Sequence, residues 1–324
     1  MHLPAKMQIK LIGKRQCAST ILIISLFALC NQSLAVDVLP SVDEWSRVSA
    51  SGSTVYKLAI DNDSLLLKKD DGFYTSGSQI SISKVLNSDN RSLTYGWKIA
   101  QDLYTASDIK LYPNQLSPID HPYAGWLYTG IFKELSESNG QGWGLGLDLG
   151  CFGPCAGGRR TQTQLHKLLD QPLPQGWDTQ LRQEWGVVLS GEWRPARWSI
   201  NQHIDVSPGI KARFGNIFTD ASVGAILRLG SLNALPEQPG NYGFLRGEII
   251  AIGYDATLQG GYFNNQQLAV NPKSAVTELE LGYQWRGATY GLYASIIRRS
   301  NGIKELDNST GAQNFARLQF IYGM

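Results

Sequence analysis

The chain has 324 residues and a formal net charge of +2, and only 17% of its residues are charged. Residues 1–35 hold four basic side chains and no acidic one, so the remaining chain carries a formal charge of −2. This nearly neutral balance gives no electrostatic basis for nucleic acid as a partner. No stretch after residue 35 approaches the roughly 18 consecutive apolar residues of a membrane-spanning helix.

Residues 1–35 have the pattern of a secretory signal peptide. A basic segment ends at Arg15, an apolar run covers 20–29, and Ala35 is a small residue suited to cleavage before Val36. The apolar run is too short to cross a bilayer as a helix. We therefore predict an exported chain. Because no linker or shift of composition divides residues 36–324, we predict that they form one domain.

Two of the four cysteines, Cys17 and Cys30, lie in the predicted signal peptide. Cys151 and Cys155 remain, and in an exported protein their close spacing favours a local disulfide. The alternative is half of a metal site, but no second ligand pair stands at a suitable spacing.

Alternation with period two dominates the chain after residue 54 and predicts β-strands. In 143–150, one face carries a tryptophan and three leucines, and the other carries three glycines and an aspartate. The predicted strands are 55–62, 73–85, 93–101, 123–133, 141–150, 183–194, 198–210, 221–230, 244–255, 275–286, 288–298 and 313–323.

Three features favour a closed membrane barrel over a soluble sandwich, which alternation alone also fits. The strands are about ten residues long, the length that a tilted strand needs to cross a bilayer. Aromatic residues cluster toward the ends of the apolar faces, as at Trp97, Trp126 and Trp193. The final segment, 314–324, is itself an alternating strand that carries aromatic residues. The predicted fold is all-β, a closed antiparallel transmembrane β-barrel of about twelve strands, an even number as in bacterial barrels.

If the N-terminus is periplasmic, the outward connections are mostly longer than the inward ones, as is usual for such barrels. A short helix is expected in one of them. The outward connections are 63–72, 102–122, 151–182, 211–220, 256–274 and 299–312, and the shorter ones include 86–92, 134–140, 195–197 and 287.

The first outward connection and its flanks, residues 60–77, are dense in oxygen ligands. They include Asp61, Asn62, Asp63, Ser64, Asp70 and Asp71. Hard cations such as Ca²⁺ take carboxylate and carbonyl oxygens, and a loop between strands can turn several toward one point. The alternative is a solvated turn, since the same residue types are ordinary turn formers.

The third outward connection changes period at 157–169, where Gln162 and His166 stand four apart on one face of a short predicted helix. By itself His166 is equally well a surface histidine. However, the corner at Asn62 and Asp63, Thr75 at the top of the second strand and this helix all fall on one rim. A base, amides and a carboxylate that converge from separate loops are typical of a hydrolytic site.

The chain resembles the outer-membrane lipid A 3′-O-deacylases (LpxR-type) over most of residues 36–324. The resemblance implies a twelve-stranded barrel, Ca²⁺-dependent ester hydrolysis on lipid A, and functional roles for Asn62, Asp63, Thr75, Gln162 and His166. Its carriers follow one another along the chain: Asn62-Asp63, Tyr74-Thr75-x-Gly77, Ile99-Ala100-Gln101-Asp102-Leu103-Tyr104, Asp120-His121-Pro122-Tyr123-Ala124-Gly125-Trp126, Gly153-Pro154-x-Ala156-Gly157-Gly158, Gln162-x-x-x-His166 and Gly176-Trp177-x-x-Gln180-Leu181.

The chain departs from the family pattern at three places. His121 stands where the family usually has Arg, and Leu111-Tyr112 occupy the span of a basic pair found in some members. Pro172 stands where some members have an acidic residue six places after the catalytic His. These departures concern contacts to the substrate headgroup more than the hydrolytic core.

The residue types predict the chemistry. His166 is the expected general base. Ca²⁺ held by Asp63, with Asn62 or backbone oxygens, would polarise the ester carbonyl. Thr75, Asn62 and Gln162 are candidate donors to the oxyanion. The sequence leaves open whether water or an acyl-enzyme carries the reaction.

The expected protein is a monomeric hydrolase in the outer membrane of a Gram-negative bacterium, with lipopolysaccharide as its substrate and its active site facing the exterior. A phospholipase barrel is an alternative, because Ser64, Ser76 and Ser78 lie near the corner. An adhesin is another. A passive channel is a third, for which the interior charges would be Lys98, Asp148, Glu278, Glu280 and Arg286.

Overall fold

The computed structural model describes residues 38–66, 72–264, 266 and 268–323. The chain divides into two compact units, Met1–Leu39 and Pro40–Met324, and every element below belongs to the second. The predicted signal peptide, residues 1–35, lies outside the described residues.

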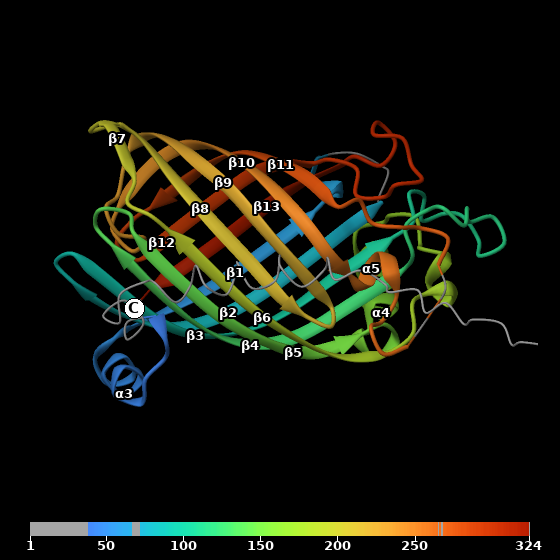
Figure 1. Ribbon diagram of the computed structural model, residues 1–324, viewed down its shortest axis with the longest axis horizontal. Helices are drawn as coiled ribbons and strands as arrows, with labels where there is room; N and C mark the ends of the chain where they lie inside the picture. Colours follow the sequence, from blue (N-terminus) through green and yellow to red (C-terminus); the bar gives the residue numbers. More distant parts are fainter. Residues whose placement is uncertain (1–37, 67–71, 265, 267, 324) are drawn as a thin grey trace, which may run out of the picture. The chain divides into compact units, whose positions relative to one another are not determined.

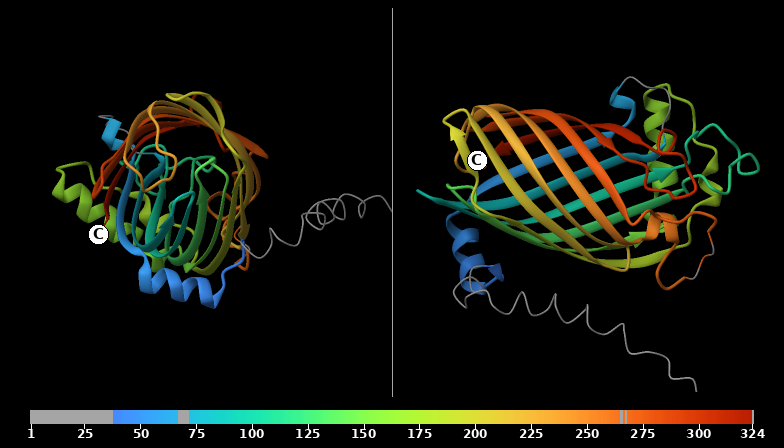
Figure 2. Two further views of the ribbon diagram at one scale, coloured as in Figure 1. Left: turned by 90° about the vertical axis from the view of Figure 1, so that its left-hand side faces the viewer. Right: turned by 45° about the horizontal axis from the view of Figure 1, so that its top comes forward.

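Within the described residues, thirteen strands form one antiparallel sheet, and all but the short β7 close into a barrel (Figures 1 and 2). Two pairings complete the ring, β1 with β13 and β6 with β8. Closure gives every strand of the barrel two neighbours, which a lipid environment requires. The strands are β1 (Ser53–Asn62), β2 (Phe73–Ser88), β3 (Arg91–Thr105), β4 (Ala124–Glu137), β5 (Gly142–Phe152), β6 (Glu184–Arg194), β7 (Trp198–Asn201), β8 (Ile204–Gly215), β9 (Phe218–Ser231), β10 (Gly240–Asp255), β11 (Ala275–Arg286), β12 (Tyr290–Arg299) and β13 (Gln313–Gly323).

The predicted barrel is confirmed, with one error in the middle of the chain. The strand predicted at 198–210 is two strands, because the chain reverses at 202–203 and β7 pairs back onto β8. The outward connection predicted at 211–220 is therefore wrong, since only 216–217 separate β8 from β9. Apolar alternation runs through the reversal, with Ile200 before it and Ile204 after it, and no glycine or proline marks the turn.

The outer wall of the barrel is apolar. Alternate side chains of β1 and β2 are exposed, among them Leu58, Ile60, Ile80 and Ile82, at 39–52% of their full accessibility. This pattern is typical of the lipid-facing band of membrane barrels. In the part of the chain that the structure describes, no helix has the length and apolar character needed to span a membrane.

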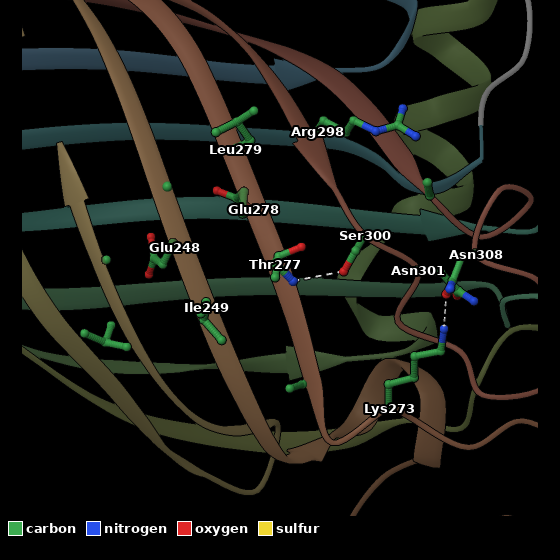
Figure 3. A pocket seen from close by; sticks show the side chains of 15 residues that line it. Glu248, Ile249, Lys273, Thr277, Glu278, Leu279, Arg298, Ser300, Asn301 and Asn308 are labelled. Atoms are coloured by element: carbon green, nitrogen blue, oxygen red, sulfur yellow. Dashed lines mark hydrogen bonds between the residues drawn. The ribbon is translucent and has the colours of Figure 1, made fainter. Parts of the chain in front are cut away.

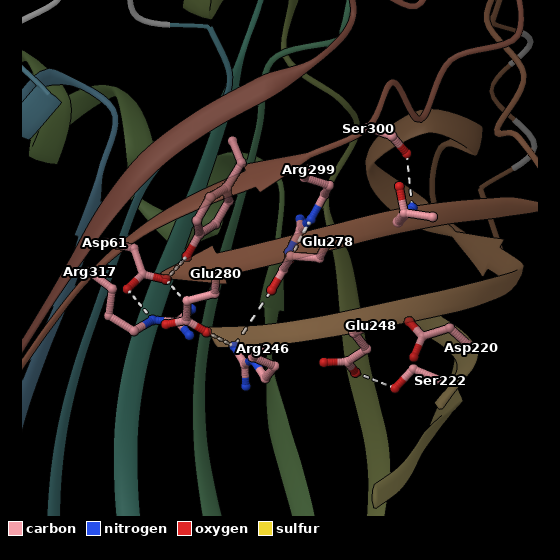
Figure 4. Close-up of polar contacts among 12 residues, drawn as sticks. Asp61, Asp220, Ser222, Arg246, Glu248, Glu278, Glu280, Arg299, Ser300 and Arg317 are labelled. Atoms are coloured by element: carbon pink, nitrogen blue, oxygen red, sulfur yellow. Dashed lines mark hydrogen bonds and ion pairs between the residues drawn. The ribbon is translucent and has the colours of Figure 1, made fainter. Parts of the chain in front are cut away.

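Several charged side chains of the lumen are paired with one another (Figure 4). Arg317 binds Asp61 at 2.6 Å, and Arg299 binds Glu278 at 2.7 Å. Glu280 is fully buried and contacts Arg246. The predicted interior charges Lys98 and Asp148 likewise pair with each other, at 2.9 Å. These ion pairs join neighbouring or next-but-one strands along the luminal face of the wall.

Helices lie at both ends of the barrel (Figure 1). At one end, α3 (Val42–Ser51) begins at Ser41, whose hydroxyl accepts a hydrogen bond from the Glu44 N–H, and Glu44 binds Lys133 of β4 at 2.6 Å. At the other end, which we call the α4 end, α4 (Gly158–Leu168) and α5 (Ala256–Gln259) lie in the longest connections. The helix predicted at 157–169 is confirmed.

The predicted disulfide is also present. Cys151 at the end of β5 is joined to Cys155, with a Cα–Cα distance of 5.9 Å. The bridge closes the first turn of the connection that leads to α4.

Candidate active site

The connection from β1 to β2 begins with the predicted corner, and its side chains are held in place. Asn62 ends β1, and its Oδ1 accepts hydrogen bonds from the N–H of Ser64 at 2.7 Å and from the Ser64 hydroxyl at 2.5 Å. The Asp63 carboxylate is buried, and its Oδ2 accepts the N–H of Gly72 at 2.9 Å. Asp63 is therefore not a solvated turn residue. Asp70 and Asp71 lie outside the described residues.

A β-bulge sets the direction of Thr75. The register between β2 and β3 shifts at Tyr74 and Ser76, so Thr75 is the extra residue. Without the shift, alternation would turn Thr75 toward the lumen with Gly77 and Gln79; a bulge can re-aim such a side chain. The Thr75 hydroxyl instead lies 2.6 Å from the hydroxyl of Thr105, and both side chains are buried.

The corner faces the outer wall of the barrel and not the lumen. Asn62 pairs with Ser76 of β2 and with Ala316 of β13, and directly paired residues share a face. Along β1 the same face carries Ile60 and Leu58, which are exposed. The corner thus stands at the α4 end of the apolar wall, where lipid contact ends.

Helix α4 supplies the second half of the site. It begins after Gly157, which has a φ of 70°, and packs against β3 and β4. Gln162 and His166 form its buried face, at 1% and 4% exposure, as the four-residue spacing predicts. The Trp177 indole N–H donates to Gln162 Oε1 at 2.7 Å. In the described structure, Gln162 Nε2 is buried without a hydrogen-bond partner.

The surroundings of His166 determine which of its ring nitrogens carries the proton. Its Nδ1 lies 2.6 Å from the carbonyl oxygen of Pro172. A carbonyl can only accept, so Nδ1 carries the proton, and the lone pair of the neutral ring is at Nε2. Pro172 stands where some family members have an acidic residue, and here its backbone carbonyl orients the imidazole.

The two halves of the site meet on the outward face of β3. Trp177, which holds Gln162, packs in one buried cluster with Leu103 and Tyr123. Leu103 is the direct partner of Ser76, and Thr105 follows it on the same face. The structure therefore brings Asn62, Thr75, Gln162 and His166 to the same end and the same side of the barrel wall. Asp63 belongs to the corner through its N–H, which donates to the Thr75 carbonyl at 3.4 Å.

The donors at the corner are of the kind that Ca²⁺ takes. Among the described residues, Asn62 supplies an amide oxygen and Asp63 a carboxylate. Ca²⁺ binds about 6–8 oxygens, including those of backbone carbonyls and waters. Among the described residues there is no group of three or more His, Cys, Asp or Glu side chains placed to hold a metal ion. Asp63 and Asn62 thus fit as two of the ligands of a calcium ion, which stays a prediction.

The sequence did not predict the supporting roles of three residues. Thr105 pairs with Thr75, Trp177 holds Gln162, and the Pro172 carbonyl holds His166. Trp177 lies in one of the motifs that carry the resemblance, so the sequence did contain a signal for its role. Thr105 and Pro172 act through a register shift and a backbone atom, for which the sequence has no signal.

His121 lies apart from these groups, on the luminal side of the α4 end. Its ring stacks on Tyr104 with the centroids 5.6 Å apart, and its Nε2 is 3.5 Å from the Thr257 hydroxyl. Burial lowers the pKa of His121, against the opposing effect of Asp255 and Asp120. The neutral imidazole is thus favoured, and His121 serves packing in this structure.

Comparison with known proteins gives one family. The sequence profile described as outer membrane protein LpxR matches residues 22–324. LpxR from Salmonella typhimurium is similar in structure, with a TM-score of 0.70 and 20% sequence identity over 83% of this chain and 99% of that one. The β domain of the Bordetella autotransporter BrkA is less similar, with a TM-score of 0.45 and 13% identity over 84% of this chain and 99% of that one. No curated protein matches the sequence.

Proposed function

This chain belongs to the family of outer membrane protein LpxR, and from that premise we propose that it is an esterase that removes the ester-linked 3′ acyl chain of lipid A. The α4 end of the barrel faces the cell exterior in this proposal. The substrate is then the lipid A of lipopolysaccharide in the outer leaflet.

One observation supports a lipid substrate above all. The register places Asn62 on the outer face of β1, directly after the exposed Ile60 and Leu58. A site in that position borders the acyl chains of a lipid on one side and its headgroup on the other. A site for a soluble substrate would have no reason to lie on the apolar wall, and a transport site would lie in the lumen.

His166 is the general base of the proposed reaction. Its Nε2 takes a proton from the attacking water while Nδ1–H remains bound to the Pro172 carbonyl. The same nitrogen then returns the proton to the sugar oxygen, which leaves as a hydroxyl as the C–O bond of the tetrahedral intermediate breaks. The products are a fatty acid and lipid A with a free 3′ hydroxyl.

Gln162 is the proposed donor to the oxyanion. Its Nε2 is buried without a partner in the described structure, whereas its Oε1 is held by Trp177. A buried amide N–H without a partner costs about 1–3 kcal/mol, and a substrate oxygen would recover this. Thr75 is fixed by Thr105 and bounds the site from β2.

Calcium is part of the proposal. Asp63 and Asn62 would hold it, and when bound it supplies a Lewis acid for the ester carbonyl. The Asp63 carboxylate is buried at the corner beside the amide oxygen of Asn62, and oxygens of both kinds are ligands that Ca²⁺ takes, which supports this role.

The test is mass spectrometry of lipid A from Gram-negative cells that lack a 3′-deacylase of their own. Expression of the wild-type chain should shift lipid A by the mass of the 3′ acyl group, and expression of His166→Ala should not. A change in glycerophospholipids instead would favour the phospholipase alternative. Unchanged lipids of both classes would contradict the proposal.

A further inference from the structure

A hollow of about 890 Å³ lies on the barrel at the α4 end, across β9 to β12 (Figure 3). The apolar side chains that line it include Val223, Ile249 and Leu279, which are 53–57% exposed. Two cations, Lys273 and Arg298, line it together with Asn308. Two carboxylates also line it, Glu248 and Glu278, and they are paired with Lys211 and Arg299. We call this the cationic groove.

The register shows that Arg298 belongs to the outer wall. Arg298 pairs with Leu279 on β11 and with Asn314 on β13, and paired residues share a face. Its neighbour Arg299 pairs with Glu278, which it binds in the lumen. Arg298 therefore stands on the lipid side, two residues beyond the exposed Ile296 on the same strand. This is the boundary between the apolar wall and the polar end.

Both cations are held by neutral groups. Arg298 Nη1 donates to Asn314 Oδ1 at 2.9 Å, and Lys273 Nζ donates to Asn308 Oδ1 at 2.5 Å. Within the described residues, neither takes part in an ion pair, unlike Arg246, Arg299 and Arg317 of the lumen. The backbone N–H of Lys273 donates to the Gly302 carbonyl at 2.8 Å. The groove thus presents two positioned positive charges beside exposed apolar surface.

The groove lies close to the candidate active site on the same wall. Asn62, Ala316 and Ile296 are aligned across β1, β13 and β12. Two strand spacings and two residues along β12 place the Cα atoms of Asn62 and Arg298 about 12 Å apart, from the usual dimensions of a sheet. A phosphorylated disaccharide can bridge that distance.

We propose that the cationic groove binds the phosphorylated headgroup of lipid A, with Arg298 and Lys273 each contacting phosphate oxygens and an acyl chain along Val223, Ile249 and Leu279. This inference rests on the proposed function and names the substrate feature that the same wall recognises. A guanidinium and an ammonium suit phosphate oxygens, with charge-assisted hydrogen bonds. The groove makes this chain selective for phosphorylated lipid A.

The experiment compares two substrates in mixed detergent micelles, bisphosphorylated lipid A and the same lipid A after removal of its phosphates. The variants are Arg298→Gln, Lys273→Gln and both together. Lys304→Gln is the matched control, because Lys304 is exposed in the connection from β12 to β13, carries the same charge and does not line the groove.

The double variant should raise KM for bisphosphorylated lipid A by roughly tenfold or more, since a hydrogen bond to a charged group is lost at each position. Its kcat should be unchanged, because binding in the groove is remote from the ester. KM for the dephosphorylated substrate should equal that of wild type, and Lys304→Gln should match wild type on both substrates. An equal KM increase for both substrates, or no increase, would overturn the proposal.

A binding measurement separates this inference from the proposed function. Native mass spectrometry of the purified barrel should show bisphosphorylated lipid A bound to wild type more tightly than to the double variant. Wild type that binds in this way but cleaves nothing would contradict the deacylase assignment and leave the groove standing. Cleavage by wild type with equal binding by the double variant would contradict the groove alone. If the double variant does not fold, comparison of Arg298→Lys with Arg298→Gln decides the same question.

Discussion

The lumen and the outer wall at the α4 end both contain polar side chains, but they use them differently. In the lumen, Asp61, Glu278 and Glu280 each contact an arginine. On the outer wall, Gln162 Nε2 has no partner among the described residues, and Arg298 is bound only through a neutral amide. Luminal charges that contact an opposite charge stabilise the barrel. Polar groups at the lipid boundary that lack such a partner among the described residues are available to a ligand.

The physical reason is the cost of charge on a lipid-facing wall. An arginine or lysine costs about 2–4 kcal/mol at the middle of a bilayer and about 0–1 kcal/mol near its surface. Polar groups such as Asn62 and Arg298 are tolerated on the wall only near its end, where lipid headgroups begin. The difference between lumen and wall can be tested by substitutions on each side.

The largest effect is expected on the wall, at His166. His166→Ala should lower the rate of ester cleavage by about 10²–10⁴-fold, the usual contribution of a general base. The barrel should still fold, as heat-modifiable migration on a gel would show. Lys167→Ala is the control, since Lys167 is exposed on the same turn of α4. Cleavage by folded His166→Ala at the wild-type rate would refute the assignment.

Asp63 should have the next largest effect. Asp63→Ala should lower cleavage by about 10²-fold or more, as loss of oxyanion stabilisation does elsewhere. Excess calcium should restore part of the activity, because the carboxylate is proposed as one ligand among several. Chelation of wild type should reproduce the loss, and added calcium should reverse it, in an assay of released fatty acid. Activity that survives chelation would rule out the metal.

A luminal charge should change stability and leave catalysis intact. Glu280 is fully buried, and it accepts hydrogen bonds from Tyr293 and Ser295 besides its contact with Arg246. Glu280→Gln takes the nearer carboxylate from Arg246, which is 17% exposed and keeps Glu278 at 3.6 Å, so the free energy of unfolding should fall by less than the roughly 3–5 kcal/mol of a fully buried pair. Urea unfolding in detergent measures this.

The control for that measurement is Glu192→Gln. Glu192 is 37% exposed at its side chain and lies 3.6 Å from Arg194, so the loss should be under about 1 kcal/mol. Cleavage per folded molecule should be the same for both variants and wild type. A fall in kcat for Glu280→Gln would show that the lumen takes part in the reaction. The lumen and the wall would then not differ in function as proposed.

The smallest effect is expected at His121. Burial lowers the pKa of His121 in the folded chain, so the unfolded chain takes up a proton first as the pH falls. Its contribution to stability is present above the ordinary pKa of about 6.5 and is lost as the pH falls below it. His121→Gln should therefore show a shallower loss of unfolding free energy between neutral and acid pH. Identical slopes for variant and wild type would contradict this.

The sequence by itself predicted the barrel and the rim. Period-two alternation placed the strands, because a barrel in lipid alternates apolar and polar faces along every strand. Chain order then placed Asn62, Asp63, Thr75, Gln162 and His166 at one end. The four-residue spacing of Gln162 and His166 correctly predicted a shared helix face.

Only the tertiary structure decided which way these groups face and what holds them. Alternation would have turned Thr75 into the lumen, and the bulge at Tyr74 and Ser76 turns it to Thr105. The reversal between β7 and β8, the carbonyl of Pro172 at His166 and the outward position of Arg298 all depend on pairing between distant strands or on backbone atoms. Periodicity is a local property of the chain, whereas register is set by which strands meet, and a shift of one residue exchanges the lipid face for the lumen.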